Sequence, residues 1–307
     1  MPEPDHDADV LMIGHFARDR LVVDGGHPED VRSETASGGG VYYGSVALRR
    51  IGLDVAVATR LHPDDFPRLD EMRQAGVRVF AAPAPETSGI ENRYNSADME
   101  RRVCKPLGFA GPFRREDIPP LSARVTMIVP IIAGEVDLPL LRWLAARGPA
   151  SGPRMQSIRI GLDVQGFVRV RKDGDDGPHL VFRQWPDMAE GLALVTYLKV
   201  DRAEAELLTG QTDLQAAARE LAAYGPREVI VTQSSGITVC AGGRIYEAPF
   251  TPRSLAGRTG RGDTCFAAYV GRRLSASTEE ACRFAAAVTT LKQEQPGPWR
   301  GTLKDVI

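Results

Sequence analysis

The stretch GRTGRGDTC, residues 257–265, combines three glycines with charged residues directly before an apolar segment, FAAYVGRRL. Glycines let main-chain N–H groups turn toward one point, and a helix N-terminus adds partial positive charge. The stretch therefore predicts an anion-binding loop followed by a helix that begins near Asp263. A carboxylate at the rim of such a loop can accept a proton from a hydroxyl that attacks phosphorus. The alternative is an aspartate N-cap after a flexible loop.

Two other nucleotide-binding patterns do not match this stretch. A Walker loop requires Gly-Lys-Ser/Thr, which is absent, and a dinucleotide-binding GxGxxG follows an early strand. Here the order is GxxGxGD, late in the chain. The function of the stretch therefore depends on which other segments accompany it in the chain.

Upstream, short β-branched runs alternate with longer amphipathic segments, which indicates an α/β protein. Such alternation predicts a wound, mostly parallel sheet with helices on both faces, and ligands at the carboxyl ends of the strands. The runs expected to form strands are residues 9–13, 54–58, 125–131, 158–163, 195–200 and 228–233. The segments expected to form helices are residues 41–52, 66–76, 138–148, 213–225 and 279–292.

Two segments, residues 20–35 and 89–103, interrupt the alternation because each resembles a hairpin without an attached helix. The second has NSADME as its turn. Hairpins inserted into a wound sheet can form a lid over an active site. They can equally be surface excursions without a function.

Composition narrows the class of protein. The chain has 307 residues, 43% hydrophobic and 25% charged, which is ordinary for a globular protein. A net charge of −2 gives no electrostatic reason to expect nucleic acid or a membrane as partner. The four cysteines are scattered, which argues against a zinc site and a disulfide framework. The acidic start, MPEPDHDADV, is unlike a secretory signal, so we expect a cytoplasmic protein.

At this point the chain resembles a known family. GRTGRGDTCFAAYV (257–270) is similar to the C-terminal signature D-[TP]-x-G-A-G-D of the ribokinase-like (PfkB) small-molecule kinases. Five further stretches are similar to motifs of that family, in the family's order: GHFARDRLV (14–22), GGGVYYGSVALRRIG (38–52), IIAGEV (131–136), KVDRAEAELLTG (199–210) and VIVTQSSGITV (229–239). The resemblance covers nearly the whole chain. It implies a single ribokinase-like domain over residues 1–307, with a small β lid built from about 15–37 and 88–106.

The resemblance also implies transfer of the γ-phosphoryl group of ATP, with Mg²⁺, to a hydroxyl of a small sugar or cyclitol. Asp263 would be the general base, and the main-chain amides of Gly260, Arg261 and Gly262 would form the anion hole. The implied donor contacts are Lys199, Asp201, Glu204, Thr232, Gly236 and Gly260, with Glu204 orienting magnesium through water. The implied acceptor contacts are Asp19, Gly38, Gly39, Tyr43 and Glu135.

Two more stretches bear on the acceptor. DVQGFVR (163–169) follows an expected strand, and ENRY (91–94) lies in the second hairpin. We therefore expect Gln165, Arg169 and Asn92 to contact a polar, hydroxyl-rich ligand. These stretches resemble an inositol-kinase-like branch of the family. An alternative for Gln165 and Arg169 is that they only fix the loop after the strand.

The chain departs from the family pattern at several positions. Gly257 and Arg258 replace Asp-Thr or Asp-Pro, and Arg261 replaces a small residue. The arginines either add positive charge against the phosphates or indicate a degenerate site. Tyr43 and Asp201 each replace an asparagine. Three alternatives therefore stay open: a nucleoside kinase, a non-catalytic nucleotide- or sugar-binding protein, and a homodimer formed through the lid.

Overall fold

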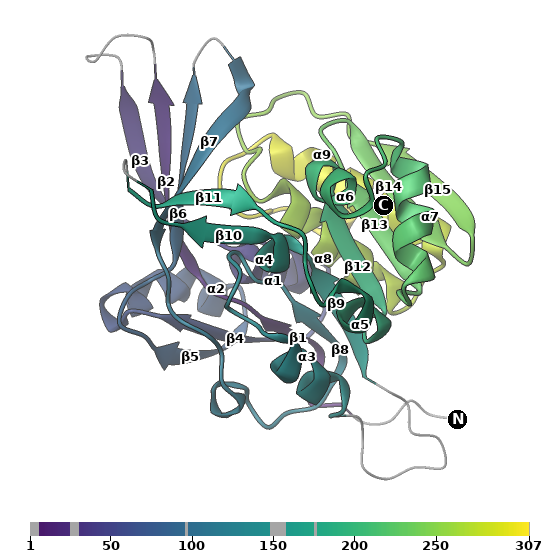
Figure 1. Cartoon of the computed structure of the whole chain (residues 1–307), viewed down its shortest axis with the longest axis horizontal. Coiled ribbons are helices and arrows are strands. Elements are labelled where there is room, and N and C mark those ends of the chain that lie inside the picture. Colours follow the sequence, from purple (N-terminus) through teal and green to yellow (C-terminus); the bar gives the residue numbers. More distant parts are fainter. Residues whose placement is uncertain (1–5, 25–30, 96–97, 148–157, 175–176, 307) are drawn as a thin grey trace.

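The computed structural model describes residues 6–24, 31–95, 98–147, 158–174 and 177–306. A nine-stranded sheet forms its centre, in the order β15-β14-β13-β12-β9-β8-β1-β4-β5 (Figure 1). Its strands are parallel except at β13–β14 and β14–β15, which pair antiparallel. The strand bounds are β1 (Ala8–Ile13), β4 (Val55–Leu61), β5 (Arg78–Pro83), β8 (Ala123–Ile128), β9 (Arg159–Asp163), β12 (Tyr197–Asp201), β13 (Glu228–Thr232), β14 (Gly236–Ala241) and β15 (Arg244–Pro249). The expected wound, mostly parallel sheet is confirmed.

Helices cover both faces of this sheet because successive strand residues point to opposite faces. In β1, Val10 and Met12 join one hydrophobic core, whereas Leu11 and Ile13 join the other. The first core is covered by α1 (Gly40–Arg50), α2 (Asp70–Gln74), α8 (Arg261–Arg273) and α9 (Thr278–Gln293). The second is covered by α3 (Leu138–Ala145), α4 (Gln165–Val168), α5 (Met188–Ala193), α6 (Arg202–Thr209) and α7 (Leu214–Ala223).

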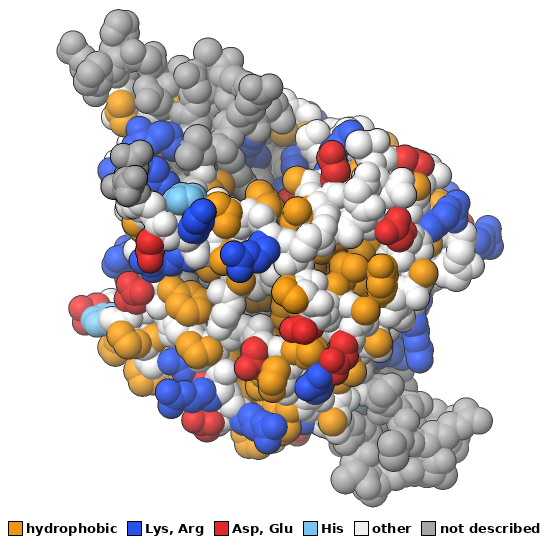
Figure 2. All heavy atoms as spheres, viewed as in Figure 1, with side chains coloured by type: hydrophobic (Ala, Val, Ile, Leu, Met, Phe, Trp, Pro, Cys, Tyr) orange, Lys and Arg blue, Asp and Glu red, His pale blue; other side chains and the backbone are white. Residues whose placement is uncertain are grey.

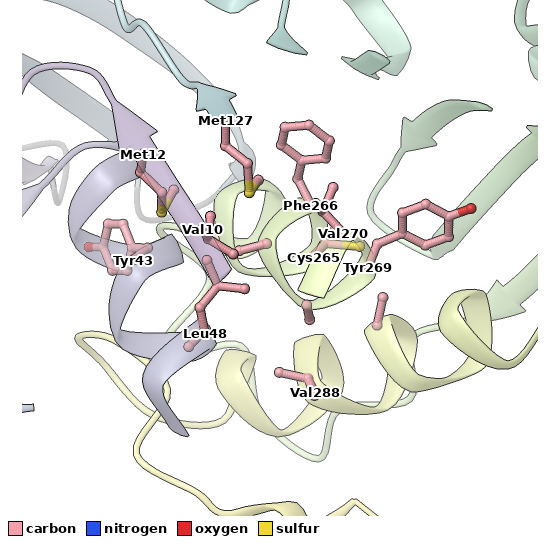
Figure 3. Packing of buried hydrophobic residues seen from close by; sticks show 14 of the residues in the cluster. Val10, Met12, Tyr43, Leu48, Met127, Cys265, Phe266, Tyr269, Val270 and Val288 are labelled. Carbon is pink, nitrogen blue, oxygen red and sulfur yellow. The ribbon is translucent and has the colours of Figure 1, made fainter. Parts of the chain in front are cut away.

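Helix α8 lies at the centre of the first core. Figure 3 shows Phe266 of α8 beside Met127 of β8, with Leu48 of α1 and Val288 of α9 packed around the same helix. All four side chains are fully buried. The N-terminus of α8 is therefore held on three sides, by α1, α9 and the sheet, and this fixes the position of the glycine-rich stretch.

A second sheet of four strands lies at one end of the first, in the order β3-β2-β6-β7 (Figure 1). Its strands are β2 (Ala17–Asp24), β3 (Arg32–Gly38), β6 (Gly89–Asn95) and β7 (Asp98–Gly108). Both expected hairpins form, and they join because β2 pairs with β6 in parallel. Part of the expected NSADME turn, residues 96–97, lies outside the described residues.

Some elements differ from the sequence-based expectation. Of the helix expected at 66–76, residues 66–69 belong to a 3-10 helix (Pro63–Leu69), and α2 covers only Asp70–Gln74. The strand expected over 125–131 ends at Ile128. The small hairpin β10 (Arg169–Lys172) and β11 (His179–Phe182) was not predicted; β11 lies against β7.

The surface shows no concentration of one charge sign on the face seen in Figure 2, where acidic and basic side chains are interspersed. This distribution is consistent with the net charge of −2. No helix in the described part of the chain combines the length and apolar character needed to cross a bilayer.

Candidate active site

A polar cleft of about 160 Å³ lies where the two sheets meet the N-termini of α1 and α8. Strands β12 and β13 end at this cleft, as expected for a ligand site in a wound sheet. The cleft is lined by Asp19, Gly39, Gly40, Tyr43, Ile90, Asn92, Ile131, Gln165, Arg169, Lys199, Asp201, Thr232 and every residue from Arg258 to Asp263. Most residues expected from the sequence therefore lie together.

Asp263 is placed in the first turn of α8, facing the start of α1. The two chain segments approach closely, because a Cβ atom built on Gly40 would lie 3.2 Å from Asp263 Oδ1. Burial raises the pKa of Asp263 above its usual value, although the charges of Lys199, Arg169 and Lys292 oppose this shift. A carboxylate with a raised pKa is a stronger base, which suits proton removal from a hydroxyl.

The anion loop, residues 257–262, turns into α8 through Gly260, whose φ of +77° is accessible mainly to glycine. Among the described residues, no hydrogen bond engages the amides of Gly260 or Gly262. The amide of Arg261 donates to the carbonyl of Arg258 at 3.2 Å. The amides of Gly260 and Gly262 are thus unpaired within the described part of the chain, as an anion hole requires, whereas the Arg261 amide closes the turn.

A network of charged side chains lies at the cleft: Lys199, Arg169 and Asp201 line it, and Asp163 and Glu204 lie behind them. Lys199 Nζ lies 3.0 Å from Asp163 Oδ2 and 3.7 Å from Glu204 Oε2. Arg169 Nη2 lies 3.3 Å from Glu204 Oε1 and 3.5 Å from Asp201 Oδ2. Burial alone would lower the pKa of Lys199, but the facing carboxylates outweigh it and raise the pKa. The charged form of Lys199 is therefore favoured.

Helix α6 begins with a capping box at the edge of this network. Asp201 Oδ1 accepts from the Glu204 amide at 2.8 Å, and Glu204 Oε2 accepts from the Asp201 amide at 2.7 Å. Asp201 lines the cleft, but Glu204 is fully buried, and burial raises its pKa to about 7. Glu204 thus lies behind Asp201, where its oxygens contact Lys199, Arg169 and the Asp201 amide.

Two of the residues expected to contact the acceptor, Asp19 and Asn92, lie on the four-stranded sheet. Asp19 Oδ1 accepts from the Ile90 amide at 2.9 Å, which fixes its carboxylate. Gly38 does not line the cleft; a Cβ atom there would lie 2.3 Å from Asp19 Oδ2, so glycine makes room for this carboxylate. Asn92 is buried and accepts from Cys104 Sγ, and Gln165 Nε2 donates to the Ile131 carbonyl at 3.3 Å.

Besides Gly38 and Glu204, two further expected site residues do not line the cleft. Glu135 is fully buried, and it accepts from the amides of Ile131 at 2.7 Å, Ile132 at 2.9 Å and His15 at 3.1 Å. It does not line the cleft, and its carboxylate instead joins the loop after β1 to the loop after β8. Gly236 does not line the cleft either; a Cβ atom there would lie 2.6 Å from the Ala248 carbonyl of the neighbouring strand.

Several residues of the site were not predicted. Asp163 was noted only as a carboxylate at a strand end, and its pairing with Lys199 arises because β9 and β12 are adjacent parallel strands. Gly40 and Thr259 were not singled out, although each neighbours a predicted residue. Lys292 lies in the last turn of α9 and contacts the anion loop, but it resembles any helical lysine in the sequence.

The chain is similar to known kinases. Residues 172–303 match the model of the pfkB family of carbohydrate kinases. A sulfate complex of a pyrophosphate-dependent kinase in the ribokinase family is 36% identical, with a TM-score of 0.84; the match covers 97% of this chain and 100% of that one. None of the curated proteins compared with the chain matches it.

Two further structures extend this likeness. A pyrophosphate-dependent kinase in the ribokinase family, complexed with a pyrophosphate analog and myo-inositol, is 35% identical, with a TM-score of 0.83 over 95% of this chain and 97% of that one. Ribokinase of Arabidopsis thaliana, complexed with ribose and ATP, is 18% identical, with a TM-score of 0.71 over 97% of both chains. The latter likeness shows the fold alone.

Proposed function

Because the chain belongs to the ribokinase (PfkB) family of carbohydrate kinases, we propose that it transfers a phosphoryl group from pyrophosphate to a hydroxyl of a cyclitol such as myo-inositol. The observation that carries the choice of donor is the presence of Arg258 and Arg261 in the lining of the cleft, at the anion loop. The family signature has an uncharged residue at each of these positions.

The charge of the loop suits a small anionic donor. A nucleotide gains binding free energy from its base and ribose, whereas pyrophosphate offers only phosphate oxygens. Guanidinium groups hold such oxygens through paired, charge-assisted hydrogen bonds. The likeness to pyrophosphate-dependent kinases supports the same donor. ATP, the donor implied by the stretches at 199–210 and 229–239, is the second candidate.

The reaction follows from the positions of the polar groups. Asp19 and Asn92 hold the acceptor, and Asp263 takes the proton of the hydroxyl that faces the donor. The hydroxyl oxygen forms a bond to the near phosphorus as the bridging P–O bond breaks, so inorganic phosphate leaves. The amides of Gly260 and Gly262 stabilise the charge on the transferring group.

Magnesium fits the donor side through Asp201. The described residues contain no group of three or more His, Cys, Asp or Glu side chains arranged to hold a metal ion. Magnesium bound mainly by phosphate oxygens and water needs only outer carboxylates, and of the two carboxylates in the α6 capping box Asp201 is the one that lines the cleft. When bound, magnesium would neutralise donor charge. Glu204, expected to orient that water, instead fixes Asp201 and α6 from behind.

The four-stranded sheet has the position of a lid, because it carries Asp19 and Asn92 over the cleft. We propose that residues 1–307 form one catalytic domain with this lid. A homodimer through the lid remains a prediction, which sedimentation would test.

Steady-state assays with pyrophosphate and ATP, each against cyclitols, sugars and nucleosides, test the proposal. We expect turnover with pyrophosphate and a cyclitol, and a loss of kcat of about 100-fold or more in Asp263→Asn, as for loss of a general base. Asp137→Asn, which keeps a helix N-cap on the opposite face of the sheet, is the matched control. Turnover with ATP alone would reject the proposed donor.

The non-catalytic alternative predicts a different outcome of the same assays. If no donor and acceptor pair gives product while ligands still raise the melting temperature, the chain binds without turnover.

A further inference from the structure

Lys292 is a buried lysine that the proposed reaction does not use, yet it lies against the anion loop. Lys292 is only 1% exposed. Its Nζ donates to the main-chain carbonyl of Gly257 and to that of Thr259, the latter at 2.5 Å. The ammonium also lies 5.1 Å from the ring centroid of Tyr43. A buried charge is costly unless several groups satisfy it. Here main-chain oxygens of the loop provide much of that stabilisation.

The hydrogen bond from Lys292 to the Thr259 carbonyl determines the direction of the Gly260 N–H. The carbonyl of Thr259 and the N–H of Gly260 belong to one planar trans peptide, so they point in opposite directions. An ammonium that holds the carbonyl on the α9 side therefore directs the Gly260 N–H away from α9. That amide has no hydrogen-bond partner among the described residues, and Gly260 lines the cleft.

The loop is also seated on the end of α9 itself. The Gly257 amide donates to the Gln293 carbonyl at 2.8 Å, and a Cβ atom on Gly257 would lie 1.7 Å from the Gln295 carbonyl oxygen. Carbonyl groups at a helix C-terminus carry partial negative charge. The loop carbonyls and the helix end thus create a negative environment around one cation.

Opposite Lys292, the Tyr43 ring supports the same turn. A Cβ atom built on Gly260 would lie 2.3 Å from the Tyr43 ring carbon Cγ. The Gly260 turn is therefore confined by an aromatic ring and by a peptide group that the ammonium holds. Asp263, the proposed base, adds a favourable charge interaction with Lys292.

We propose that Lys292 is a positioning residue for phosphoryl transfer: its ammonium is a built-in cation that holds the anion loop with the Gly260 amide directed at the donor. The inference rests on the proposed function, because it assigns a task within that site. Lys292 contacts neither donor nor acceptor in this assignment.

Chemical rescue distinguishes a positioning cation from a packing residue. Lys292→Ala opens space for a small cation between the two carbonyls, whereas Lys292→Met fills most of that space with an uncharged chain. We expect kcat to fall by about 30–300-fold in both variants, the range typical of a misplaced transition-state donor. Added ammonium, methylammonium or potassium should restore kcat at least severalfold in Lys292→Ala and not in Lys292→Met.

Controls make the result decisive. Arg283→Ala removes an exposed cation from the same helix and should leave kcat unchanged. Retention of kcat within threefold in Lys292→Ala would overturn the inference. The inference would also be overturned if kcat fell equally in Lys292→Ala and Lys292→Met, no added cation restored it, and calorimetry showed that both variants bind inorganic phosphate as tightly as the wild type.

The phosphate measurement also separates the two proposals. If wild-type protein shows no turnover with any donor, the proposed function fails. Lys292 is then judged by binding alone: weaker phosphate binding in Lys292→Ala that ammonium restores supports a positioning cation, and unchanged binding contradicts it.

Discussion

The cations that line the cleft lie in different surroundings. Lys199 and Arg169 each contact two carboxylates. Arg258 and Arg261 lie on the anion loop. In the proposed reaction these two arginines add positive charge next to a small anionic donor, whose binding does not need an adenosine group.

Replacement of Arg261 tests this distribution. Arg261→Met removes a charge-assisted contact of about 1.5–3 kcal/mol, so KM for pyrophosphate should rise about 10- to 100-fold. KM for the cyclitol should stay within twofold. Steady-state kinetics at fixed ionic strength measure both, with the exposed Arg253→Met as control. An equal rise in both KM values would place Arg261 outside the donor site.

The ionisation of Lys292 gives a second test at a single residue. Burial lowers the pKa of Lys292 to about 8, although Asp263 favours its charged form. The ammonium is the active form in our assignment, so kcat should be retained below that pKa and lost as pH rises through about 8. The other titratable group against Nζ is Tyr43, whose pKa burial raises beyond its usual value.

The control for this pH profile is Lys292→Arg, because a guanidinium stays charged at all accessible pH values. The loss of kcat at alkaline pH should then move upward, even if kcat itself is reduced. Ionisation of pyrophosphate is the same for both enzymes. An identical alkaline limb in the two profiles would assign it to the donor or to another group.

At the scale of elements, the N-terminus of α8 depends on a left-handed glycine packed against an aromatic ring. Gly260→Ala would place a methyl group within 2.5 Å of three Tyr43 ring carbons. We expect a lower melting temperature and a fall in kcat of about 10-fold or more, as when one anion-hole donor is displaced. Thermal unfolding and kinetics measure the two effects.

Gly242→Ala is the matched control for this substitution. Gly242 has a φ of +55° and no atom within 4 Å of a built Cβ, so alanine there meets only the left-handed strain of about 1 kcal/mol. Equal destabilisation in both variants would show that contact with Tyr43 is unimportant.

Another element-scale feature is the buried ion network that joins β9, β12, α6 and β10. Lys199→Met would leave Asp163 and Glu204 buried without the lysine they face. Removal of one partner of a buried pair typically lowers the free energy of unfolding by about 3–5 kcal/mol. Chemical denaturation should show this loss, whereas the exposed Lys172→Met on β10 should not.

The loss should be larger at high pH than at low pH. Without Lys199, ionised carboxylates in the core destabilise the folded state, and this penalty disappears once they are protonated. A stability difference independent of pH would show that Lys199 acts through packing and not through charge.

For the whole molecule, local sequence was sufficient to predict an element where one residue pattern corresponds to one structure. The central strands were predicted because their β-branched runs are typical of strands buried on both faces. The two hairpins were predicted because no helical pattern lies between their strands. The parallel pairing of β2 with β6 depends on segments about 70 residues apart, which no local pattern records. The β10–β11 hairpin was missed because its two strands have only four residues each.

The candidate site likewise contains residues that a sequence motif identifies and residues that only the folded structure brings into contact. Asp263, Gly260 and Asp19, whose roles the family resemblance implied, do line one cleft. Lys292 was missed because its partners are main-chain carbonyls, which every residue has. Glu135 does not line the cleft, because the amides of its own loop, at Ile131 and Ile132, satisfy its carboxylate.

A final prediction concerns how the two sheets work together. Asp19 lies on β2 and Asn92 on β6, while Asp263 and the anion loop belong to the main sheet's side of the cleft. An acceptor held between them should therefore couple the sheets. At about 100 times Kd, bound acceptor adds about 2.7 kcal/mol of stability to the closed form.

Hydrogen exchange of the full chain measures this coupling. Amides of β2, β3 and β6 should exchange up to about 100-fold more slowly with saturating myo-inositol and inorganic phosphate, because 1.4 kcal/mol corresponds to tenfold. The edge strand β5, at the far end of the main sheet, should be little affected. Asp19→Asn should abolish the protection because the acceptor loses its fixed carboxylate. Protection at β5 equal to that in the four-stranded sheet would indicate global stabilisation and reject a lid that closes over the acceptor.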